Sequence, residues 1–150
     1  MSEILNGKIA IVTGSGQGIG RAVAEDLAAH GAKILVVDPG LSLDGNVENA
    51  SLADEVVDGI IKAGGEAKAN KSSVASFESG QEIVQDALDS FGRLDIVVTV
   101  AGILRDRMIF NMTEEEWHDV IDVHLTGTFS IIRHAAPIFR AQKSGRIITF

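Results

Sequence analysis

The chain has 150 residues, 45% of them hydrophobic and 23% charged, which is enough for one domain with a substantial core. Its net charge of −8 disfavours nucleic acid as a partner, because an acidic surface repels phosphate backbones. The chain has no cysteine, which excludes disulfides and thiolate metal sites and fits a reducing compartment, so we expect a cytoplasmic location and no metal. The N-terminus shows no secretory signal, and the most apolar segment, 96–104, is too short to span a bilayer, so no membrane partner is expected.

Short β-branched runs alternate with longer amphipathic segments along the chain. The sequence predicts buried strands at 8–13 and 33–37, a weak third strand at 66–69, and further strands at 95–100 and 146–150. Apolar residues at helical spacing predict helices over about 19–28, 52–61 and 83–88, ended by Gly31, Gly64-Gly65 and Gly92. A polar loop, 39–49, follows the second strand.

A longer helix is predicted after the fourth strand. Thr113 is a candidate N-cap, and Glu116 three residues later completes a capping box. The helix should run to about Gln142, either in one piece or broken in two near its start, and Pro137 inside it should remove one backbone hydrogen bond.

Alternation of strands and helices predicts an α/β fold with a doubly wound parallel sheet of Rossmann type. The strands are apolar on both faces, which implies helices on both sides of the sheet and right-handed crossovers. The sequence stops in the fifth strand, where the sheet would be half covered. We therefore expect residues 1–150 to be a Rossmann-type domain truncated after the fifth strand, the N-terminal part of a longer single domain.

A glycine-rich segment joins the first strand to the first helix. The glycines fit G-x-x-x-G-x-G at Gly14, Gly18 and Gly20, rather than G-x-G-x-x-G, and no G-K-[ST] follows. Glycines allow a sharp turn close to a pyrophosphate, and the helix N-terminus stabilises an anion. The pattern favours a dinucleotide over a nucleoside triphosphate, and the alternative is a glycine-rich turn without a ligand.

Asp38 directly follows the second strand. A carboxylate at this strand end can accept hydrogen bonds from adenosine ribose hydroxyls and would repel a 2′-phosphate, and Pro39 adds no positive charge. Both features favour NAD over NADP as the cofactor. The alternative is a solvated aspartate in a turn.

These motifs together resemble the short-chain dehydrogenase/reductase family along all 150 residues. The resemblance is carried by Thr13-Gly14-x-x-x-Gly18-Ile19-Gly20, by Asp38 and by Ala101-Gly102 after the fourth strand. Within the family, the chain is most similar to the (3R)-hydroxyacyl-CoA dehydrogenase domains of peroxisomal multifunctional enzymes, on the segments 69–74, 91–95, 101–107 and 123–125.

The resemblance implies an NAD-dependent oxidoreductase that interconverts a secondary alcohol and a ketone, with a 3-hydroxyacyl-CoA thioester as one candidate substrate and a homo-oligomer as the expected assembly. It implies cofactor contacts from Gly14, Ser15, Gln17, Gly18, Ile19, Asp38, Ser73, Val74, Thr99, Ala101 and Gly102. The family's catalytic serine and Tyr-x-x-x-Lys follow its fifth strand, and this chain has no tyrosine. The chain alone is thus expected to bind cofactor poorly and to catalyse nothing.

Three positions depart from the family pattern. Thr99-Val100 stands where most members have Asn-Asn, and Ser73 replaces an aspartate that contacts adenine, a role that the backbone of Val74 could also fill. His124 replaces a catalytic asparagine on the long helix, as it does in the multifunctional-enzyme group. His124 is therefore a candidate catalytic residue that supports proton transfer, and the alternative is a hydrogen-bonded core histidine.

Other ionisable residues have simpler explanations. His118 and Asp122 could share a helix face, but two ligands do not make a metal site. Arg105, Asp106 and Arg107 follow the fourth strand and could either touch substrate or form a solvated loop. Two other functions stay open: a dinucleotide-binding regulatory or scaffold module without catalysis, which Thr99 would suit, and a nucleoside-using transferase, which the glycine spacing disfavours.

Overall fold

The computed structural model describes residues 3–42 and 49–150, so most of the predicted polar loop after Asp38 lies outside the described residues. The strands form one parallel sheet in the order β3-β2-β1-β4-β5. Their bounds are Ile9–Thr13 (β1), Lys33–Val37 (β2), Glu66–Asn70 (β3), Ile96–Thr99 (β4) and Arg146–Thr149 (β5). Each lies within a residue or two of its predicted position, and in β1, β2 and β4 the buried β-branched run coincides with the strand.

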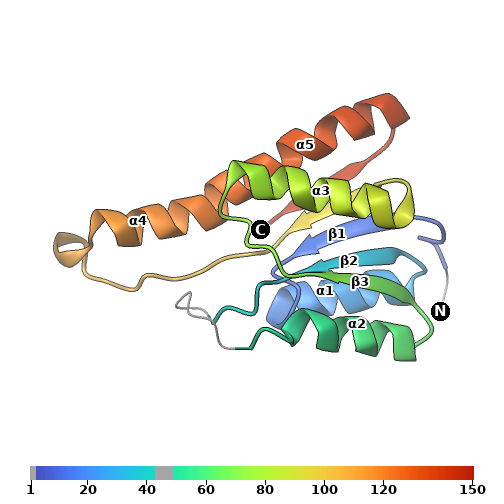
Figure 1. The fold of residues 1–150 in the computed structure, drawn as a ribbon, viewed down its shortest axis with the longest axis horizontal. Helices are drawn as coiled ribbons and strands as arrows, with labels where there is room; N and C mark the ends of the chain where they lie inside the picture. Colours follow the sequence, from blue (N-terminus) through green and yellow to red (C-terminus); the bar gives the residue numbers. More distant parts are fainter. Residues whose placement is uncertain (1–2, 43–48) are drawn as a thin grey trace.

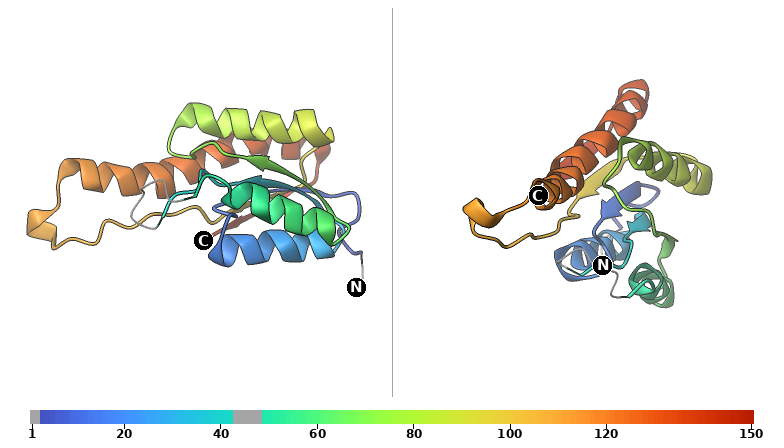
Figure 2. Two further views of the ribbon diagram at one scale, coloured as in Figure 1. Left: turned by 60° about the horizontal axis from the view of Figure 1, so that its bottom comes forward. Right: turned by 60° about the vertical axis from the view of Figure 1, so that its left-hand side comes forward.

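The helices cover both faces of this sheet, as the doubly wound fold requires (Figures 1 and 2). The α-helices are α1 (Gly18–Ala29), α2 (Leu52–Lys62), α3 (Phe77–Phe91), α4 (Glu114–Ile121) and α5 (Gly127–Gln142). Helices α1 and α2 lie on one face, and α3 and α5 lie on the other. The predicted Rossmann-type α/β architecture is confirmed.

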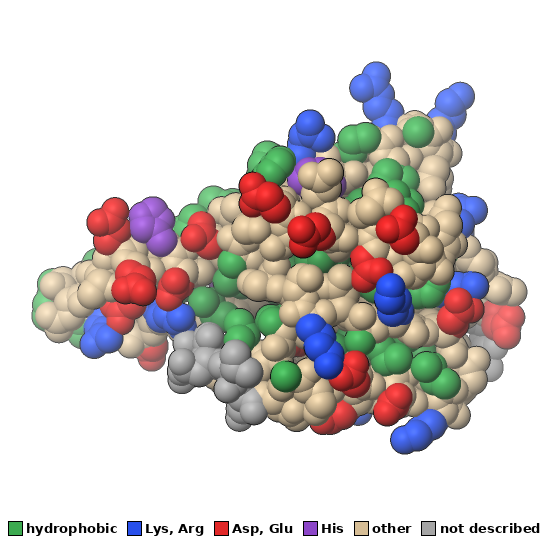
Figure 3. All heavy atoms as spheres, in the orientation of Figure 1, with side chains coloured by type: hydrophobic (Ala, Val, Ile, Leu, Met, Phe, Trp, Pro, Cys, Tyr) green, Lys and Arg blue, Asp and Glu red, His purple; other side chains and the backbone are tan. Residues whose placement is uncertain are grey.

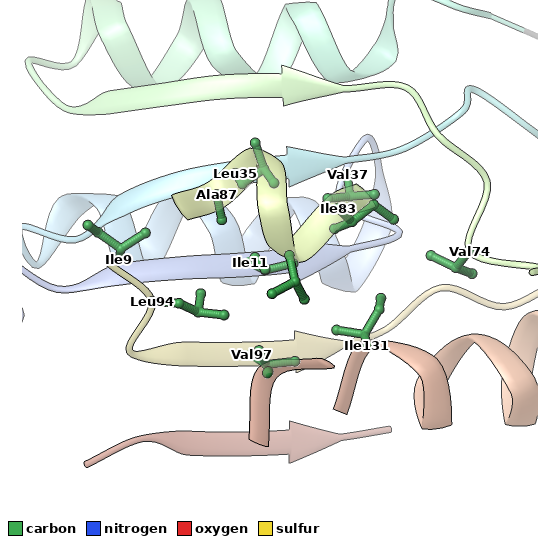
Figure 4. Packing of buried hydrophobic residues seen from close by; sticks show 12 residues of the cluster. Ile9, Ile11, Leu35, Val37, Val74, Ile83, Ala87, Leu94, Val97 and Ile131 are labelled. Atoms are coloured by element: carbon green, nitrogen blue, oxygen red, sulfur yellow. The ribbon is translucent and has the colours of Figure 1, made fainter. Parts of the chain in front are cut away.

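Alternate residues of β1, β2 and β4 contribute to two separate hydrophobic cores. Ile11 and Val97 point to the face covered by α3 and α5, where they pack with Ile83 and Ile131 (Figure 4). Val12, the neighbour of Ile11, points to the opposite face and packs in the cluster covered by α1 and α2. Because both faces are dry, the central strands contain almost no polar residues along their length.

Helix ends mostly follow the predicted signals, with one exception. Gly92 ends α3 in the left-handed region with φ of 80°, a conformation that glycine adopts without a steric penalty. The sequence pattern marks α3 only by apolar positions from Ile83 onward and does not locate its start. The helix begins at Phe77 because Ser76 acts as its N-cap, with the Ser76 hydroxyl accepting a hydrogen bond from the backbone N–H of Ser79 at 3.1 Å.

The long helix after β4 begins as predicted and is interrupted once. The capping box is present: the Thr113 hydroxyl accepts from the Glu116 N–H at 3.1 Å, and the Glu116 carboxylate accepts from the Thr113 N–H at 2.9 Å. A π-helical turn, η2 (Asp122–Thr126), separates α4 from α5, so the helix is divided near its start. A short 3₁₀ turn, η1 (Ile109–Asn111), which the sequence patterns missed, precedes α4.

Helix α4 projects beyond the end of the sheet, and the connection from β4 runs out to meet it (Figure 1). Acidic side chains are spread over the face seen in Figure 3, from this projecting end to the helices beside the sheet. The edge strand β5 is exposed on both sides. Among the described residues, no helix is long and apolar enough to cross a membrane.

The opposite, amino-terminal edge of the sheet is held together by the buried Asp95. Its carboxylate accepts from the Ile9 N–H at 3.1 Å and from the Arg93 guanidinium at 2.6 and 2.8 Å, while its carbonyl accepts from the Arg146 N–H. Burial favours the neutral acid, but the hydrogen bonds and the nearby positive charges of Arg93 and Lys8 outweigh it, so the pKa of Asp95 lies below its ordinary value.

We predict that Asp95→Asn lowers the free energy of unfolding by about 1–3 kcal/mol at pH 7, because a buried charged acceptor is lost from its donors. A lowered pKa in the folded state stabilises the fold above the ordinary pKa of an aspartate, and this stabilisation is lost as the pH falls. The difference between wild type and variant should therefore shrink below about pH 4. Urea unfolding at several pH values measures it, with the exposed Asp58→Asn as control. A difference independent of pH would contradict this account.

Candidate functional site

A cavity of about 400 Å³ opens at the carboxyl ends of β1, β2 and β4, beside the start of α1. Parallel sheets place ligands at this edge, where the strand order reverses. Its walls come from the four loops that follow β1, β2, β3 and β4, from the first turn of α1, and from single residues of β2 and the π turn. The lining residues are Gly14, Gln17, Gly18, Ile19, Gly20, Val37, Asp38, Pro39, Leu41, Ser42, Ser73, Val74, Val100, Ala101, Gly102, Ile103 and Val123.

The three motif glycines are required for different reasons. A Cβ on Gly14 would lie 2.7 Å from the Ala101 Cα, and a Cβ on Gly20 would lie 2.0 Å from the Gly14 carbonyl oxygen, so both allow close backbone packing. Gly18 has open space around it but a φ of 55°, which favours glycine. The loop is therefore compact at its base and open above, toward the cavity.

The loop after β4 is held against this glycine loop by Thr13. The Thr13 hydroxyl oxygen accepts from the N–H groups of Val100 and Ala101 at 3.1 and 3.2 Å. These bonds fix the start of the loop whose next residues, Gly102 and Ile103, line the cavity. In the sequence, Thr13 stands out only as part of the glycine motif. Its role in holding the loop after β4 depends on the pairing of β1 with β4, which the sequence does not show.

Asp38 is buried, with 6% of its surface exposed, and borders the cavity. It carries the only ionisable side chain among the described lining residues, and none of these is a lysine or arginine. The sequence of 43–48, outside the described residues, contains no lysine or arginine either. An anion placed here would be held by backbone N–H groups rather than by a cationic side chain.

Nine of the eleven predicted cofactor-binding residues line the cavity, and Ser15 and Thr99 do not. The Ser15 hydroxyl donates to the Val12 carbonyl at 2.6 Å and accepts from the Val37 N–H at 3.0 Å, so it is used inside the protein. Thr99 is 4% exposed, and its hydroxyl has no hydrogen-bond partner among the described residues. Ser73, by contrast, is at the wall, with its hydroxyl accepting from the Ala75 N–H at 3.2 Å.

His124 lies on the π turn, next to the cavity rather than in its wall. Its Nε2 is 3.1 Å from the Ile103 nitrogen and 2.9 Å from the Ile103 oxygen, so it binds the Ile103 backbone in either tautomer. The imidazole also covers Gly102, where a Cβ would lie 2.6 Å from its Cε1. His124 is exposed among the described residues, whereas a core histidine would be buried.

The two arginines between β4 and α4 pair with carboxylates of α4. Arg105 donates to the Asp119 carboxylate at 2.8 and 3.1 Å, and Arg107 donates to the Glu116 carboxylate at 3.0 Å through its Nε. These pairs brace the connection against α4. His118 lies 3.5 Å from Glu114, and no cluster of three possible metal ligands occurs among the described residues.

Several wall residues were missed from the sequence. Leu41 and Ser42 come from the loop after Asp38, and Ile103 and Val123 add an apolar wall beside Gly102. Leu41 and Ser42 could have been suspected from their nearness to Asp38. Val123 has no such signal, because an apolar helix residue is read most simply as part of the core.

Comparison with known proteins places this site in a family. The family model described as short chain dehydrogenase matches residues 8–150. The chain belongs to the short-chain dehydrogenase family. A short-chain dehydrogenase from Mycobacterium avium has a solved structure that superposes with a TM-score of 0.87 at 47% identity, over 97% of this chain and 54% of that one.

The subgroup resemblance of this short-chain dehydrogenase chain is also confirmed. The chain is 45% identical to the Peroxisomal multifunctional enzyme type 2 of Drosophila melanogaster over 143 residues. This alignment covers 95% of this chain and 23% of that protein. The chain is 43% identical to the Hydroxyacyl-CoA dehydrogenase ChsB1 of Mycobacterium tuberculosis over 136 residues. This alignment covers 91% of this chain and 41% of that protein. The chain thus spans about half or less of these relatives.

Thr99, where the family pattern has asparagine, gives a stability test. A buried hydroxyl without a partner costs free energy, so Thr99→Val should leave the free energy of unfolding unchanged or raise it by up to about 1 kcal/mol. The matched control is Thr13→Val, which leaves two backbone N–H groups without their acceptor and should destabilise. Thermal and urea unfolding measure both, and a clear destabilisation by Thr99→Val would show that its hydroxyl has a partner.

Proposed function

We propose that this short-chain dehydrogenase chain is the cofactor-binding part of an NAD(H)-dependent oxidoreductase that interconverts a secondary alcohol and a ketone. The observation that carries the proposal is the cavity between the glycine loop and the loop after β4, bordered by Asp38. The residues present fit a dinucleotide: Gly18 leaves open space where a side chain would otherwise stand, and unpaired backbone N–H groups begin α1 beside it.

The bound cofactor would span the whole cavity. The glycine loop would hold the pyrophosphate, Asp38 would accept from the adenosine ribose, and Ser73 and Val74 would border the adenine. Ala101, Gly102 and Ile103 would hold the nicotinamide half. The cofactor supplies the chemistry of hydride transfer, and the protein supplies its position and excludes water.

A 3-hydroxyacyl thioester is the proposed substrate class. One similar protein is named a hydroxyacyl-CoA dehydrogenase, and the subgroup resemblance gives the same class. The chain has no tyrosine, so in the complete protein we expect the serine and the Tyr-x-x-x-Lys of the family to follow Phe150. The homo-oligomer and the cytoplasmic location stay predictions, and one relative carries the word peroxisomal in its name.

The complete protein should bind NAD at least about tenfold more tightly than NADP, since a 2′-phosphate would meet the carboxylate of Asp38 with no cation nearby among the described lining residues. Isothermal titration of both cofactors at equal ionic strength measures the ratio. Omitting the cofactor from the reaction and testing each in turn gives a second measurement. Tighter binding of NADP would refute the cofactor assignment, and failure to bind either would refute the proposed function.

His124→Ala should lower kcat by at least about tenfold and change the Kd for NAD much less, because His124 contacts the backbone of Ile103 and not the phosphate loop. The matched control is His118→Ala, an exposed histidine on the same long helix that lies beside Glu114, away from the cavity. Turnover, NAD affinity and thermal unfolding are measured on the same preparations. A folded His124→Ala variant with unchanged kcat would exclude the supporting role.

A further inference from the structure

The glycine loop is fastened to the end of β2 by three hydrogen bonds. The Ser15 hydroxyl accepts from the Val37 N–H at 3.0 Å, the Ser15 N–H donates to the Val37 carbonyl at 3.3 Å, and the Gly16 N–H donates to Asp38 Oδ2 at 2.8 Å. The parallel pairing of β1 with β2 ends at Thr13 and Val37. These bonds therefore extend the attachment beyond the sheet and into the loop.

Asp38 is itself held from the other side. Its second carboxylate oxygen, Oδ1, accepts from the Gly40 N–H at 2.7 Å, and its backbone N–H donates to the Asn70 carbonyl at 3.0 Å. Each oxygen of the buried carboxylate thus has a backbone N–H donor, and its orientation is fixed without any nucleotide. An oxygen can accept more than one hydrogen bond, so this does not prevent contact with a ribose.

The packing around this contact leaves no space for adjustment. A Cβ built on Gly16 would lie 2.8 Å from the Asp38 Cγ, 2.8 Å from its Oδ2 and 2.8 Å from the Leu52 Cβ. The loop, the end of β2 and the start of α2 therefore meet closely around Gly16. A side chain at Gly16 would have to displace Asp38 or Leu52.

We propose that Ser15 and Asp38 form a latch that shapes the phosphate-binding loop before the nucleotide binds, so that Asp38 positions the pyrophosphate site as well as bordering the ribose site. This inference rests on the proposed nucleotide-binding function. In this arrangement, Ser15 is a positioning residue that acts only through the loop. The two halves of the nucleotide site form one unit, and weakening the latch weakens binding at both.

Asp38→Asn distinguishes the proposed latch from a role of Asp38 in ribose binding alone. An amide has one acceptor oxygen, and the Gly16 and Gly40 N–H groups approach different oxygens of Asp38, so the variant side chain can accept from only one of them in this geometry. If the latch operates, this variant of the complete protein loses affinity for NAD by about tenfold or more, and for NADP the same loss offsets the gain from removing the repelling charge. If Asp38 only reads the ribose, the amide still bonds its hydroxyls, NAD binding changes little, and NADP binding improves because the repelling charge is gone.

Ser15→Ala tests the latch at a residue that does not line the cavity. It should weaken NAD binding by several-fold to about tenfold, although the side chain has no access to a ligand. Ser130→Ala is a matched control, since Ser130 is equally buried at 0% exposure and its hydroxyl also donates to a backbone carbonyl, that of Phe77, at 2.6 Å. It should leave the NAD affinity unchanged even if it lowers stability by a similar amount.

Amide hydrogen exchange without nucleotide gives a readout that is independent of cofactor binding. The N–H groups of Gly16 and Gly40 should exchange slowly in the wild type, and at least one should exchange about tenfold faster in Asp38→Asn. Protection in the wild type without NAD binding would refute the proposed function and leave the latch intact. Unchanged exchange at both glycines, or unchanged NAD affinity in both Asp38→Asn and Ser15→Ala, would overturn the latch.

Discussion

The site depends on the close packing of two loop backbones, at Gly14 and Ala101. A Cβ at Gly14 would come within 2.7 Å of the Ala101 Cα, so only a glycine lets the loop after β1 lie against the loop after β4. The Thr13 hydroxyl also holds the two loops together, because it accepts hydrogen bonds from two backbone N–H groups of the loop after β4. Because β1 is the central strand, this junction lies where the strand order reverses, and the cavity opens directly above it.

The proposed function requires this cavity to hold an anion in a protein that is itself acidic. The net charge is −8, and the described lining residues contain no cation, so the attraction must come from backbone N–H groups that are fixed in place. Fixed dipoles are effective only when the backbone that carries them does not rearrange. This gives a physical reason for the hydrogen bonds that tie Ser15 and Gly16 to the end of β2.

The π turn between α4 and α5 likewise holds residues in place, on the other side of the cavity. Its extra residue places Val123 at the wall and brings His124 back over Gly102, where Nε2 binds the Ile103 backbone. Single π turns inside long helices often occur at functional sites, where they redirect side chains that a regular helix would place elsewhere. The ion pairs of Arg105 and Arg107 with α4 hold the connection between β4 and α4 in place. This side of the cavity is therefore supported by the connection as well as by the π turn.

Local sequence patterns were enough to predict the strands, most of the helices and the general place of the site, although they missed η1. Periodicity located all five strands, and the spacing of Gly14, Gly18 and Gly20, with Asp38 after β2, indicated a dinucleotide site at the carboxyl edge of the sheet. Which motif residues face the cavity could be seen only once the chain was folded. Ser15 and Thr99 belong to the same motifs but point into the protein, and Val123 faces the cavity from a helix that is otherwise packed or exposed. The reason is that local patterns are set by strand and helix periods, whereas the direction of a loop side chain is set by hydrogen bonds and close contacts between segments far apart in the chain.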